Sequence, residues 1–405
     1  MIPVMKQREA VITGVGVVNA LAGDFDGFVD AMRQGRCGQR PITSFDATGL
    51  RNPQACEAVD FELQPIHEKQ GKRKMERSSE LVLTAFSQAV AMAEIDLHGV
   101  TPGRGAVALG STLGGALTGL RYYRGVRQGR RRPSLLRDYS MHAPGYRLCI
   151  ESGFLGPNLL FSTACTSSNL ALSVACDLIC FDKADVVIAG GFDTMSEVSC
   201  SGFSVMRNVS PNICRPFDRN RQGLILGEGS ALLIVEAGDF AAKRGASTLA
   251  TIRGYGLTSD AYHMTAPDTT AIGATACMQQ AIKMAGTDAA DIDFICAHGT
   301  GTVHNDRTEA KAIHKVFGRR AGEIACSSIK SMLGHTLGAA GAMNAVAAIA
   351  GKHGRYIPPT IHFVEADAQN PVACSAEART GSPRLALSNA FGFGGANCCV
   401  LLELH

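Results

Sequence analysis

The chain has 405 residues, of which 46% are apolar, and a formal net charge of +3 at pH 7. This length allows two domains or one large duplicated core, and the apolar fraction predicts a substantial interior. The near-balanced charge argues against a general nucleic-acid binder, so an anionic partner should bind a local basic patch. We also expect no membrane partner, because Asn344 interrupts the best apolar run, 339–350, and a spanning helix needs about 18 apolar residues.

The cysteines and histidines do not form a ligand pattern. The 14 cysteines show no Cys-x-x-Cys spacing, and no signal peptide precedes the first apolar strand, so we expect free thiols in a reduced, cytoplasmic protein. Neither these cysteines nor the 11 histidines have the paired spacing of zinc ligands, so we expect no metal site.

The stretch 10–18 predicts a buried strand followed by a glycine turn at Gly14 and Gly16. A dinucleotide-binding fingerprint does not fit, because its third glycine is missing and no acidic residue ends a following strand in a clear βαβ unit. A helix is expected at 25–34, and irregular structure after it.

Two basic clusters come next in the chain. The first, 69–77, leads into an amphipathic helix that starts near Leu81, and the second lies at 127–132. Together they suggest one surface for docking an anionic partner. A merely solvated face is the alternative for each cluster.

Cys165 lies where a strand passes into a helix. Residues 158–161 are typical of the end of a buried strand, and apolar residues recur at helical spacing between Leu170 and Ile179. The start of a helix favours a thiolate and lowers the pKa of a cysteine, because unpaired N–H groups and the helix dipole point there. Cys165 is therefore a candidate nucleophile, with a buried, inert cysteine as the alternative.

The order of elements predicts an α/β fold. A second apolar run at 184–189 ends in Gly190 and Gly191, and strand, helix and strand in this order form a βαβ unit with parallel strands. After a further strand at 231–235, the alternation starts again with elements at 249–252, 271–285 and 294–297. We therefore divide the chain into an N-terminal half, 1–250, and a C-terminal half, 251–405.

Polar residues follow strands in the C-terminal half. His298 comes directly after an apolar strand, at the carboxyl edge where open α/β sheets place their ligand sites. Lys330 and His335 lie in glycine-rich stretches that we expect to be non-helical, and glycines alternate with Phe391 and Phe393 before a last strand at 398–402. Taken singly, each histidine could be structural and the lysine solvated.

One cysteine and two histidines at strand ends suit acyl transfer coupled to decarboxylative condensation. A thiolate takes up an acyl chain as a thioester, and a malonyl thioester is then decarboxylated beside it. Two imidazoles can donate hydrogen bonds to the enolate oxygen, while backbone N–H groups form an oxyanion hole at the acyl carbonyl.

Seven motifs resemble the elongating β-ketoacyl-acyl-carrier-protein synthases of the thiolase superfamily: 163–167, 215–218, 227–229, 259–265, 298–302, 330–335 and 392–395. The match runs in order from about residue 10 to the C-terminus. The resemblance implies a thiolase-like fold of two similar βαβαβ halves in five α-β-α-β-α layers. It also implies a dimer, either of identical chains or with a paralogue that resembles a chain-length factor.

The resemblance also implies roles for single residues. By position, Cys165 corresponds to the acyl nucleophile, while His298 and His335 correspond to the pair that promotes malonyl decarboxylation. Lys330 corresponds to a lysine that supports the histidines electrostatically. Glu309 corresponds to an acidic residue that interacts with this lysine and orders the site.

Further positions correspond to supporting groups of the family. Phe393 matches a gating phenylalanine, and the backbone N–H groups of Cys165 and Phe393 match the oxyanion hole. Thr300 and Thr302 match hydroxyls that hydrogen-bond a pantetheine arm, and Asp306 belongs to the same supporting set. No cofactor is implied, because the substrates arrive on the phosphopantetheine arm of an acyl carrier protein.

Carrier proteins of this kind are acidic, so the basic clusters acquire a candidate partner. By position, five residues are expected to contact it: Arg73, Lys74, Arg131, Arg132 and Arg207.

Related enzymes supply the alternatives. Initiating synthases use Cys-His-Asn, so His335 favours elongation, and a chain-length factor usually lacks the cysteine. A thiolase would use a second cysteine near the glycine loop, but Cys398 and Cys399 fall in a strand pattern typical of core. The segment 301–309 resembles the Gly-Thr-x-x-Asn-Asp pattern of polyketide-type synthases, which favours specialised polyketide or polyene synthesis over primary fatty-acid synthesis. The preferred chain length does not follow from the sequence.

Overall fold

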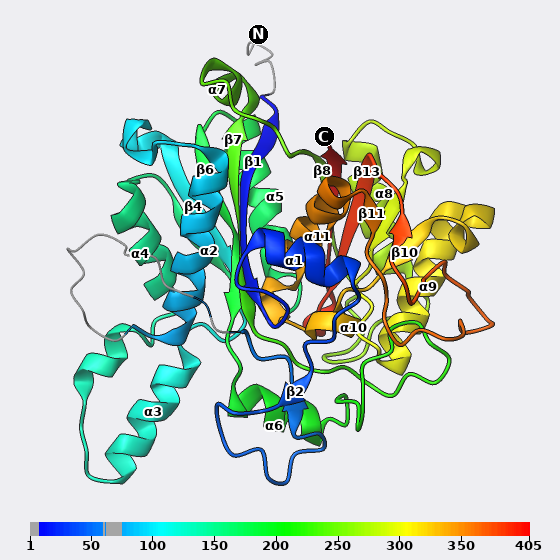
Figure 1. The fold of residues 1–405 in the computed structure, drawn as a ribbon, viewed down its shortest axis with the longest axis horizontal. Helices are drawn as coiled ribbons and strands as arrows, with labels where there is room; N and C mark the ends of the chain where they lie inside the picture. The colour runs from blue at the N-terminus through cyan, green and yellow to red at the C-terminus, as the bar shows by residue number, and fades with distance from the viewer. Residues whose placement is uncertain (1–7, 60, 62–74) are drawn as a thin grey trace.

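The computed structural model describes residues 8–59, 61 and 75–405, and its centre is a ten-stranded mixed sheet (Figure 1). The strands of the first half are β1 (Ala10–Asn19), β4 (Gly105–Gly110), β5 (Asn158–Phe161), β6 (Val186–Asp193) and β7 (Gly229–Ala237). Those of the second half are β8 (Ala250–Ser259), β9 (Phe294–Cys296), β10 (Ala325–Ser327), β13 (Leu385–Phe391) and β14 (Ala396–Leu404). Two short ribbons lie outside this sheet: β2 (Arg40–Pro41) with β3 (Gln54–Ala55), and β11 (Tyr356–Ile357) with β12 (Arg379–Thr380).

The two halves share one strand order. The first half runs β1-β7-β6-β4-β5 and the second runs β8-β14-β13-β9-β10, which is the same permutation of each half's five strands. In both halves the first two pairings in this order are antiparallel and the last two are parallel. The halves join where β1 pairs antiparallel with β8. The fold is therefore α/β and internally duplicated, as the alternation of elements predicted.

Helices cover the strands in layers. The described helices are α1 (Phe25–Arg33), α2 (Arg77–Ala93), α3 (Ala116–Arg127), α4 (Ala143–Ser152), α5 (Ser167–Cys180), α6 (Glu197–Val205), α7 (Gly238–Lys243), α8 (Ile272–Met284), α9 (Val303–Phe317), α10 (Lys330–Leu333) and α11 (Ala340–Gly354). Helix α2 packs on β1 and β7, α5 and α11 pack between the halves, and α8 packs on β8 and β14 with α9 beside it. This is the expected order of five layers.

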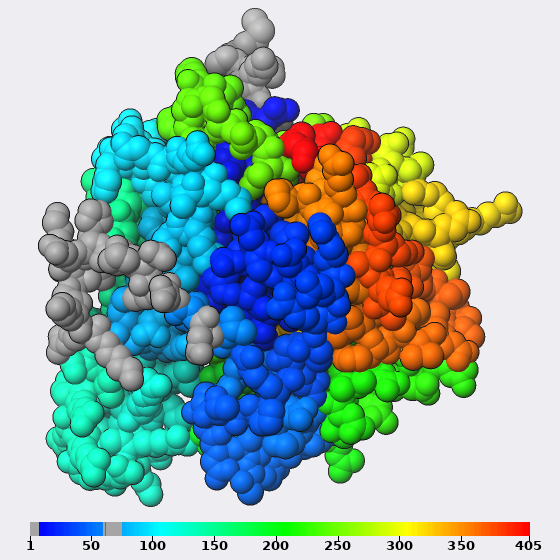
Figure 2. Space-filling model, viewed as in Figure 1, coloured from blue at the N-terminus to red at the C-terminus, as the bar shows by residue number. Residues whose placement is uncertain are grey.

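Small side chains make the central layer possible. Helix α11 is buried on all sides from Ala340 to Gly351, and alanine and glycine predominate in it. A helix that contacts sheet on two faces cannot be amphipathic, and small residues let both faces approach closely. In the space-filling view, N-terminal colours fill one side of the molecule and yellow to red the other (Figure 2). Among the described residues, each helix is too short or too polar to be a membrane span.

The expected glycine turn near the N-terminus is wrong. Gly14 and Gly16 lie inside β1, which continues to Asn19. A Cβ on Gly16 would lie 1.8 Å from the carbonyl oxygen of Ala85, and one on Gly14 would lie 2.1 Å from that of Ala89. These glycines are required because α2 presses its backbone against the strand.

Two further expectations need correction. The strand at Asn158–Phe161 exists, but its residues are half-buried rather than buried, because β5 ends the sheet and pairs only with β4. Lys330, expected in a non-helical stretch, begins the short helix α10, and Gly334 ends that helix with a φ of +71°.

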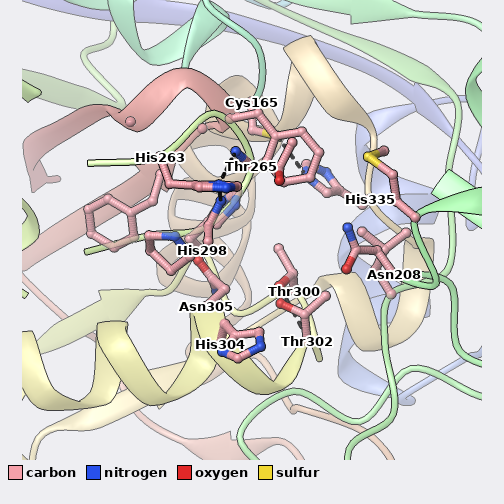
Figure 3. Close-up of a pocket in the computed structure, with 18 of the residues that line it drawn as sticks. Cys165, Asn208, His263, Thr265, His298, Thr300, Thr302, His304, Asn305 and His335 are labelled. Carbon is pink, nitrogen blue, oxygen red and sulfur yellow. Dashed lines mark hydrogen bonds between the residues drawn. The ribbon is translucent and has the colours of Figure 1, made fainter. Parts of the chain in front are cut away.

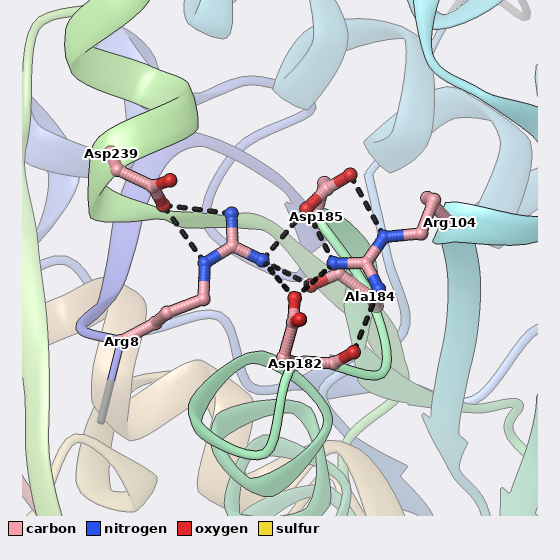
Figure 4. Close-up of polar contacts among 6 residues, drawn as sticks. All are labelled: Arg8, Arg104, Asp182, Ala184, Asp185 and Asp239. Atoms are coloured by element: carbon pink, nitrogen blue, oxygen red, sulfur yellow. Dashed lines mark hydrogen bonds and ion pairs between the residues drawn. The ribbon is translucent and has the colours of Figure 1, made fainter. Parts of the chain in front are cut away.

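A network of ion pairs ties segments at the end of the sheet where β4 and β6 begin (Figure 4). Arg8 pairs with Asp185 at 2.7 Å and with Asp239 at 2.7 Å, and Arg104 also pairs with Asp185 at 2.7 Å. Most of these side chains are partly exposed, so each pair contributes at most about 1 kcal/mol. The network braces the sheet at the end away from the residues of the candidate site.

Candidate active site

Cys165 lies at the tip of a tight connection between β5 and α5. Ala164, just before it, has a φ of +52°, which few non-glycine residues adopt. The hydroxyl of Ser167 accepts a hydrogen bond from the Thr163 N–H at 2.9 Å and donates one to the Ala164 carbonyl at 2.6 Å. This clamp holds the thiol, which is 7% exposed, at the carboxyl edge of the sheet.

His335 reaches the same place from the other half of the chain. Its backbone N–H donates to the Ile225 carbonyl at 2.7 Å, and its own carbonyl accepts from the Gly227 N–H at 2.9 Å. Its Nε2 lies 3.0 Å from Cys165 Sγ. The Leu337 N–H donates to Nδ1 at 3.1 Å, so in the neutral ring the proton is on Nε2 and points to the sulfur.

His298 completes the group. Its ring centroid lies 5.3 Å from that of His335, at an interplanar angle of 81°. The carboxylate of Glu309 accepts the His298 N–H at 2.8 Å and the Gly299 N–H at 2.7 Å, which fixes the backbone that carries the ring. The ligand atoms of Cys165, His298 and His335 all lie within 4.8 Å of one another. Thiolate and imidazole are also zinc ligands, so a bound metal would occupy the nucleophile.

Burial dominates the ionisation of the thiol. It raises the pKa of Cys165 to about 11, although Lys330 and the backbone N–H groups of Cys165 and Phe393 act in the opposite direction. The expectation of a lowered pKa is therefore wrong, because loss of hydration outweighs the local donors. The two N–H groups that favour the thiolate are the same two that the sequence assigns to the oxyanion hole.

Both imidazoles are held neutral. Burial and the charge of Lys330 hold the pKa of His298 and of His335 well below the ordinary value of 6.5. The pKa of Lys330 is itself lowered by burial. A neutral imidazole keeps both an N–H donor and a free lone pair, whereas an imidazolium would set its Nδ1–H against the Leu337 N–H.

Glu309 does not pair directly with Lys330. Neither a hydrogen bond nor an ion pair joins them, and within the described ranges Lys330 Nζ and His298 Nδ1 have no hydrogen-bond partner. Burial raises the pKa of Glu309 to about 7, against the hydrogen bonds that it accepts from Gly299, Asn389 and His298. Its contact with the lysine is electrostatic, and its direct effect is on the His298 backbone.

Cys165, His298 and His335 line a cavity of about 370 Å³ (Figure 3). Thr300 and Thr302 stand on one wall with their hydroxyl oxygens 2.8 Å apart. Asp306, which is buried, accepts the N–H groups of Gly301 and Phe217, at 3.1 Å and 2.7 Å, and so supports that wall from behind.

Phe393 and its neighbour Phe203 form another part of the wall. Their rings stack with centroids 5.6 Å apart. The Gly394 N–H donates to the Met264 carbonyl at 2.8 Å, so the glycine loop is joined to the segment after β8.

Several lining residues received no role from the sequence. They are Phe203, Met206, Asn208, Asp260, His263, His304 and Asn305. Asp260 joins the start of β14 to the loop after β8, because it accepts from Asn397 Nδ2 at 2.7 Å and from the Asp268 N–H at 3.0 Å. His263 belongs to a motif noted in the sequence, but nothing in the pattern of apolar residues distinguishes a lining side chain from a surface one.

The expected docking residues have different outcomes. Arg73 and Lys74 lie outside the described residues. Arg131 and Arg132 are exposed after α3, and Arg207 is exposed between two residues that line the cavity. Arg124 on α3 pairs with Glu197 on α6 at 2.5 Å, so the helix before the second basic cluster is joined to the helix that carries the lining residue Phe203.

Cys398 and Cys399 are core residues, as expected. They are 1% and 0% exposed, and Cys399 Sγ donates to Asn389 Oδ1 at 3.2 Å. The thiolase alternative needs a second thiol beside the nucleophile. In the described part of the chain, Cys165 is the only cysteine that lines the cavity.

Models of known families match most of the chain. The description "Beta-ketoacyl synthase, N-terminal domain" applies to residues 7–241 and "Beta-ketoacyl synthase, C-terminal domain" to residues 249–364. Similar curated proteins are the 3-oxoacyl-acyl-carrier-protein synthase 2 of Coxiella burnetii, 35% identical over 98% of this chain and 99% of the relative, and that of Staphylococcus aureus, 33% identical over the same shares.

Solved structures show the same fold. The ishigamide ketosynthase/chain length factor superposes with a TM-score of 0.91 at 31% identity, covering 98% of this chain and 100% of the other. A β-ketoacyl synthase from Burkholderia phymatum gives 0.90 at 29% identity, with coverage of 98% and 100%. A ketosynthase from Xenorhabdus doucetiae in complex with its chain length factor gives 0.87 at 28% identity, with coverage of 98% of each chain. The thiolase-like architecture is thereby confirmed.

Proposed function

The chain belongs to the β-ketoacyl synthase family, and from this premise we propose that it elongates an acyl chain by condensing it with malonyl on an acyl carrier protein. Cys165 carries the acyl group, and His298 and His335 act on the malonyl group. The observation that carries the proposal is the 3.0 Å contact between His335 Nε2 and Cys165 Sγ, with His298 beside both. No cofactor takes part, because the carrier's phosphopantetheine arm supplies both thioesters.

The first step is acyl transfer. The sulfur of Cys165 attacks the carbonyl carbon of the incoming acyl thioester, and the carbonyl oxygen takes up the negative charge. The N–H groups of Cys165 and Phe393 stabilise that oxygen. The bond to the carrier's sulfur then breaks, and the proton from the Cys165 thiol leaves on the carrier's thiol.

The second step is decarboxylation. The bond between the malonyl carboxylate and its methylene carbon breaks, CO₂ leaves, and the electron pair moves into the thioester as an enolate. The Nε2–H of His335 and the imidazole of His298 stabilise the enolate oxygen by hydrogen bonds. The positive charge of Lys330 keeps both rings neutral and thus able to donate without losing a proton.

Condensation closes the cycle. The enolate carbon attacks the thioester on Cys165, the same oxyanion hole holds the tetrahedral oxygen, and the carbon–sulfur bond breaks. The 3-oxoacyl product is then on the carrier protein, and the Cys165 thiolate takes a proton from solvent. To test this, the purified chain is mixed with acyl and malonyl carrier protein. A product two carbons longer, formed with one CO₂, supports the proposal; unchanged malonyl carrier protein overturns it.

We propose that the pathway is a specialised one. The support is the Asn305–Asp306 pair, in which the lining residue Asn305 donates from Nδ2 to Asp306 Oδ1 at 3.0 Å, and the likeness to the ishigamide ketosynthase. Loading of Cys165 by a series of saturated and polyunsaturated acyl carriers, read by intact mass, tests the assignment; exclusive loading by saturated chains contradicts it.

We also propose that a second subunit of the same fold covers the free edge of β5. A strand that ends a sheet offers unpaired N–H and carbonyl groups, and large apolar side chains are exposed nearby, including Tyr146 at 62% and Leu155 at 81%. Native mass spectrometry distinguishes the two partners: a dimer of the purified chain indicates identical subunits, and a monomer that dimerises only with a paralogue indicates a chain-length factor.

A further inference from the structure

Asp193 is the last residue of β6 and is 1% exposed. Its carboxylate accepts hydrogen bonds from two segments that are far apart in the sequence. The donors are Ser111 Oγ at 2.8 Å, Thr112 N at 2.9 Å, Thr112 Oγ1 at 2.6 Å and Leu113 N at 2.9 Å in the first segment, and Gly338 N at 2.6 Å in the second. A buried carboxylate with this many donors is an organised junction rather than a chance burial.

The second segment carries His335. Leu337, whose N–H donates to His335 Nδ1, has a φ of +51°, and Gly338 follows it directly. A Cβ on Gly338 would lie 2.8 Å from Asp193 Oδ2 and 2.7 Å from the Cα of Ser111. The backbone of this turn therefore packs directly against the carboxylate of Asp193. The Gly338 N–H makes the shortest hydrogen bond of the backbone donors to this carboxylate.

The first segment, residues 111–113, binds the Asp193 carboxylate as well. Residues 111–113 follow β4, and the Gly114 N–H donates to Ser111 Oγ at 2.9 Å. Leu113 packs with Leu337 and Met195 in one apolar cluster. The turn after His335 is thus fixed by packing on one side and by the carboxylate on the other.

The carboxylate also acts on the nucleophile through its charge. Asp193 raises the pKa of Cys165, while Lys330 lowers it. Neutralising position 193 should therefore make the thiol easier to ionise. Loss of burial would also lower the pKa of Cys165. A variant that keeps the charge at position 193 therefore separates the two causes, because only exposure of the sulfur would lower the pKa in it.

We propose that Asp193 is a positioning residue for the condensation proposed above, on which this inference rests. By binding the Gly338 N–H it holds the Leu337 N–H on His335 Nδ1, so the proton of the ring remains on Nε2 and faces the sulfur and the substrate. The hydrogen bonds to Asp193 thus orient the ring of His335 through the turn that follows it.

Two variants separate geometry from charge. Asp193→Asn turns one acceptor into an NH₂ group that faces other donors, so malonyl decarboxylation should fall about 100-fold, the usual effect of misplacing a catalytic group by about 1 Å. Acyl uptake should fall much less, and the pH midpoint for alkylation of Cys165 by iodoacetamide should decrease. Asp193→Glu keeps the charge but moves it, so decarboxylation should fall while the pH midpoint of alkylation stays the same.

Asp177→Asn is the matched control. The Asp177 carboxylate accepts a hydrogen bond from Tyr255 Oη at 2.8 Å and does not touch the turn, so neither the decarboxylation rate nor the alkylation midpoint should change.

Wild-type decarboxylation in either Asp193 variant overturns the proposal, and so does an equal loss of acyl uptake and decarboxylation in both. If Asp193→Asn does not fold, Asp193→Glu alone tests the proposal, which requires that decarboxylation fall more than acyl uptake in this variant. A wild-type chain that does not decarboxylate malonyl carrier protein overturns the proposed function instead. The alkylation midpoint of Asp193→Asn then still shows whether the carboxylate acts on the sulfur.

Discussion

The Nε2 atom of His335 lies 3.0 Å from the sulfur of Cys165, although 170 positions separate the two residues in the chain. Because the Leu337 N–H occupies Nδ1, the ring donates to the sulfur and cannot act as its base in this tautomer. The same N–H that faces the resting thiol can later face a substrate oxygen. One orientation of one ring thus serves both halves of the reaction.

The rate of alkylation of Cys165 should keep rising with pH up to about pH 11. With its pKa raised to about 11, the group is a thiol at neutral pH, and the thiolate fraction rises about tenfold per pH unit below that value. Peptide mass spectrometry after brief iodoacetamide treatment measures this site apart from the other cysteines. A plateau below about pH 9 would show that the donors around the sulfur outweigh its burial.

Replacing His335 should divide the reaction. In His335→Ala we expect Cys165 to accept acyl groups as before, because the oxyanion hole is intact, while decarboxylation falls about 100-fold with the loss of one donor. His335→Asn returns an N–H donor and should recover part of that loss. Assays with acyl carrier protein alone and malonyl carrier protein alone measure the two steps. Loss of acylation with decarboxylation retained would reverse the assigned roles.

Replacing Lys330 should shift the acid side of the pH profile of decarboxylation to higher pH. Lys330 lowers the pKa of both histidines, so in Lys330→Met these values rise and imidazolium forms at higher pH. Burial, the larger cause of the lowered pKa values, is unchanged in this variant, so decarboxylation should remain at neutral pH and be lost at a higher pH than in the unchanged chain as the pH falls. Since Nζ has no hydrogen-bond partner in the described ranges, thermal stability should be kept or increased. An unchanged pH profile would argue that the lysine does not act on the rings.

Reversing the charge of the second basic cluster should weaken carrier binding. For the double variant Arg131→Glu, Arg132→Glu we expect slower association at low salt and a smaller difference at high salt, because exposed charges are screened. Arg319→Glu, an exposed arginine in the other half, is the control. Surface plasmon resonance at two salt concentrations measures both. Equal affinity of the double variant and the wild type at low salt would remove these residues from the docking surface.

Local sequence patterns predicted where strands lie, but they did not predict which other elements pack against those strands. Apolar runs identified β1 and β6, but the glycines of β1 suggested a turn because the sequence does not show that α2 lies against them. Likewise β5 looked buried, since an apolar run does not reveal which strand ends the sheet. Neighbours in space, not along the chain, decide both cases.

The site shows the same limit. Cys165 and His298 could be found because each follows an apolar strand, and the same signal was available for Asp193 after Gly190 and Gly191. His335 was expected at a strand end too, but in the structure it follows the short helix α10. The direction of the Cys165 pKa could not be predicted, because it depends on how completely the fold buries the sulfur. Residues such as His263 come from loops whose packing no periodic pattern describes.

The intact mass of the chain during one turnover tests the central claim most directly. After incubation with acyl carrier protein, the mass should rise by one acyl group on the Cys165 peptide. Addition of malonyl carrier protein should return it to the starting value, with one CO₂ released for each acyl group lost. An equal mass gain in Cys165→Ala, or an acyl group that stays on the chain while CO₂ is released, would contradict the account.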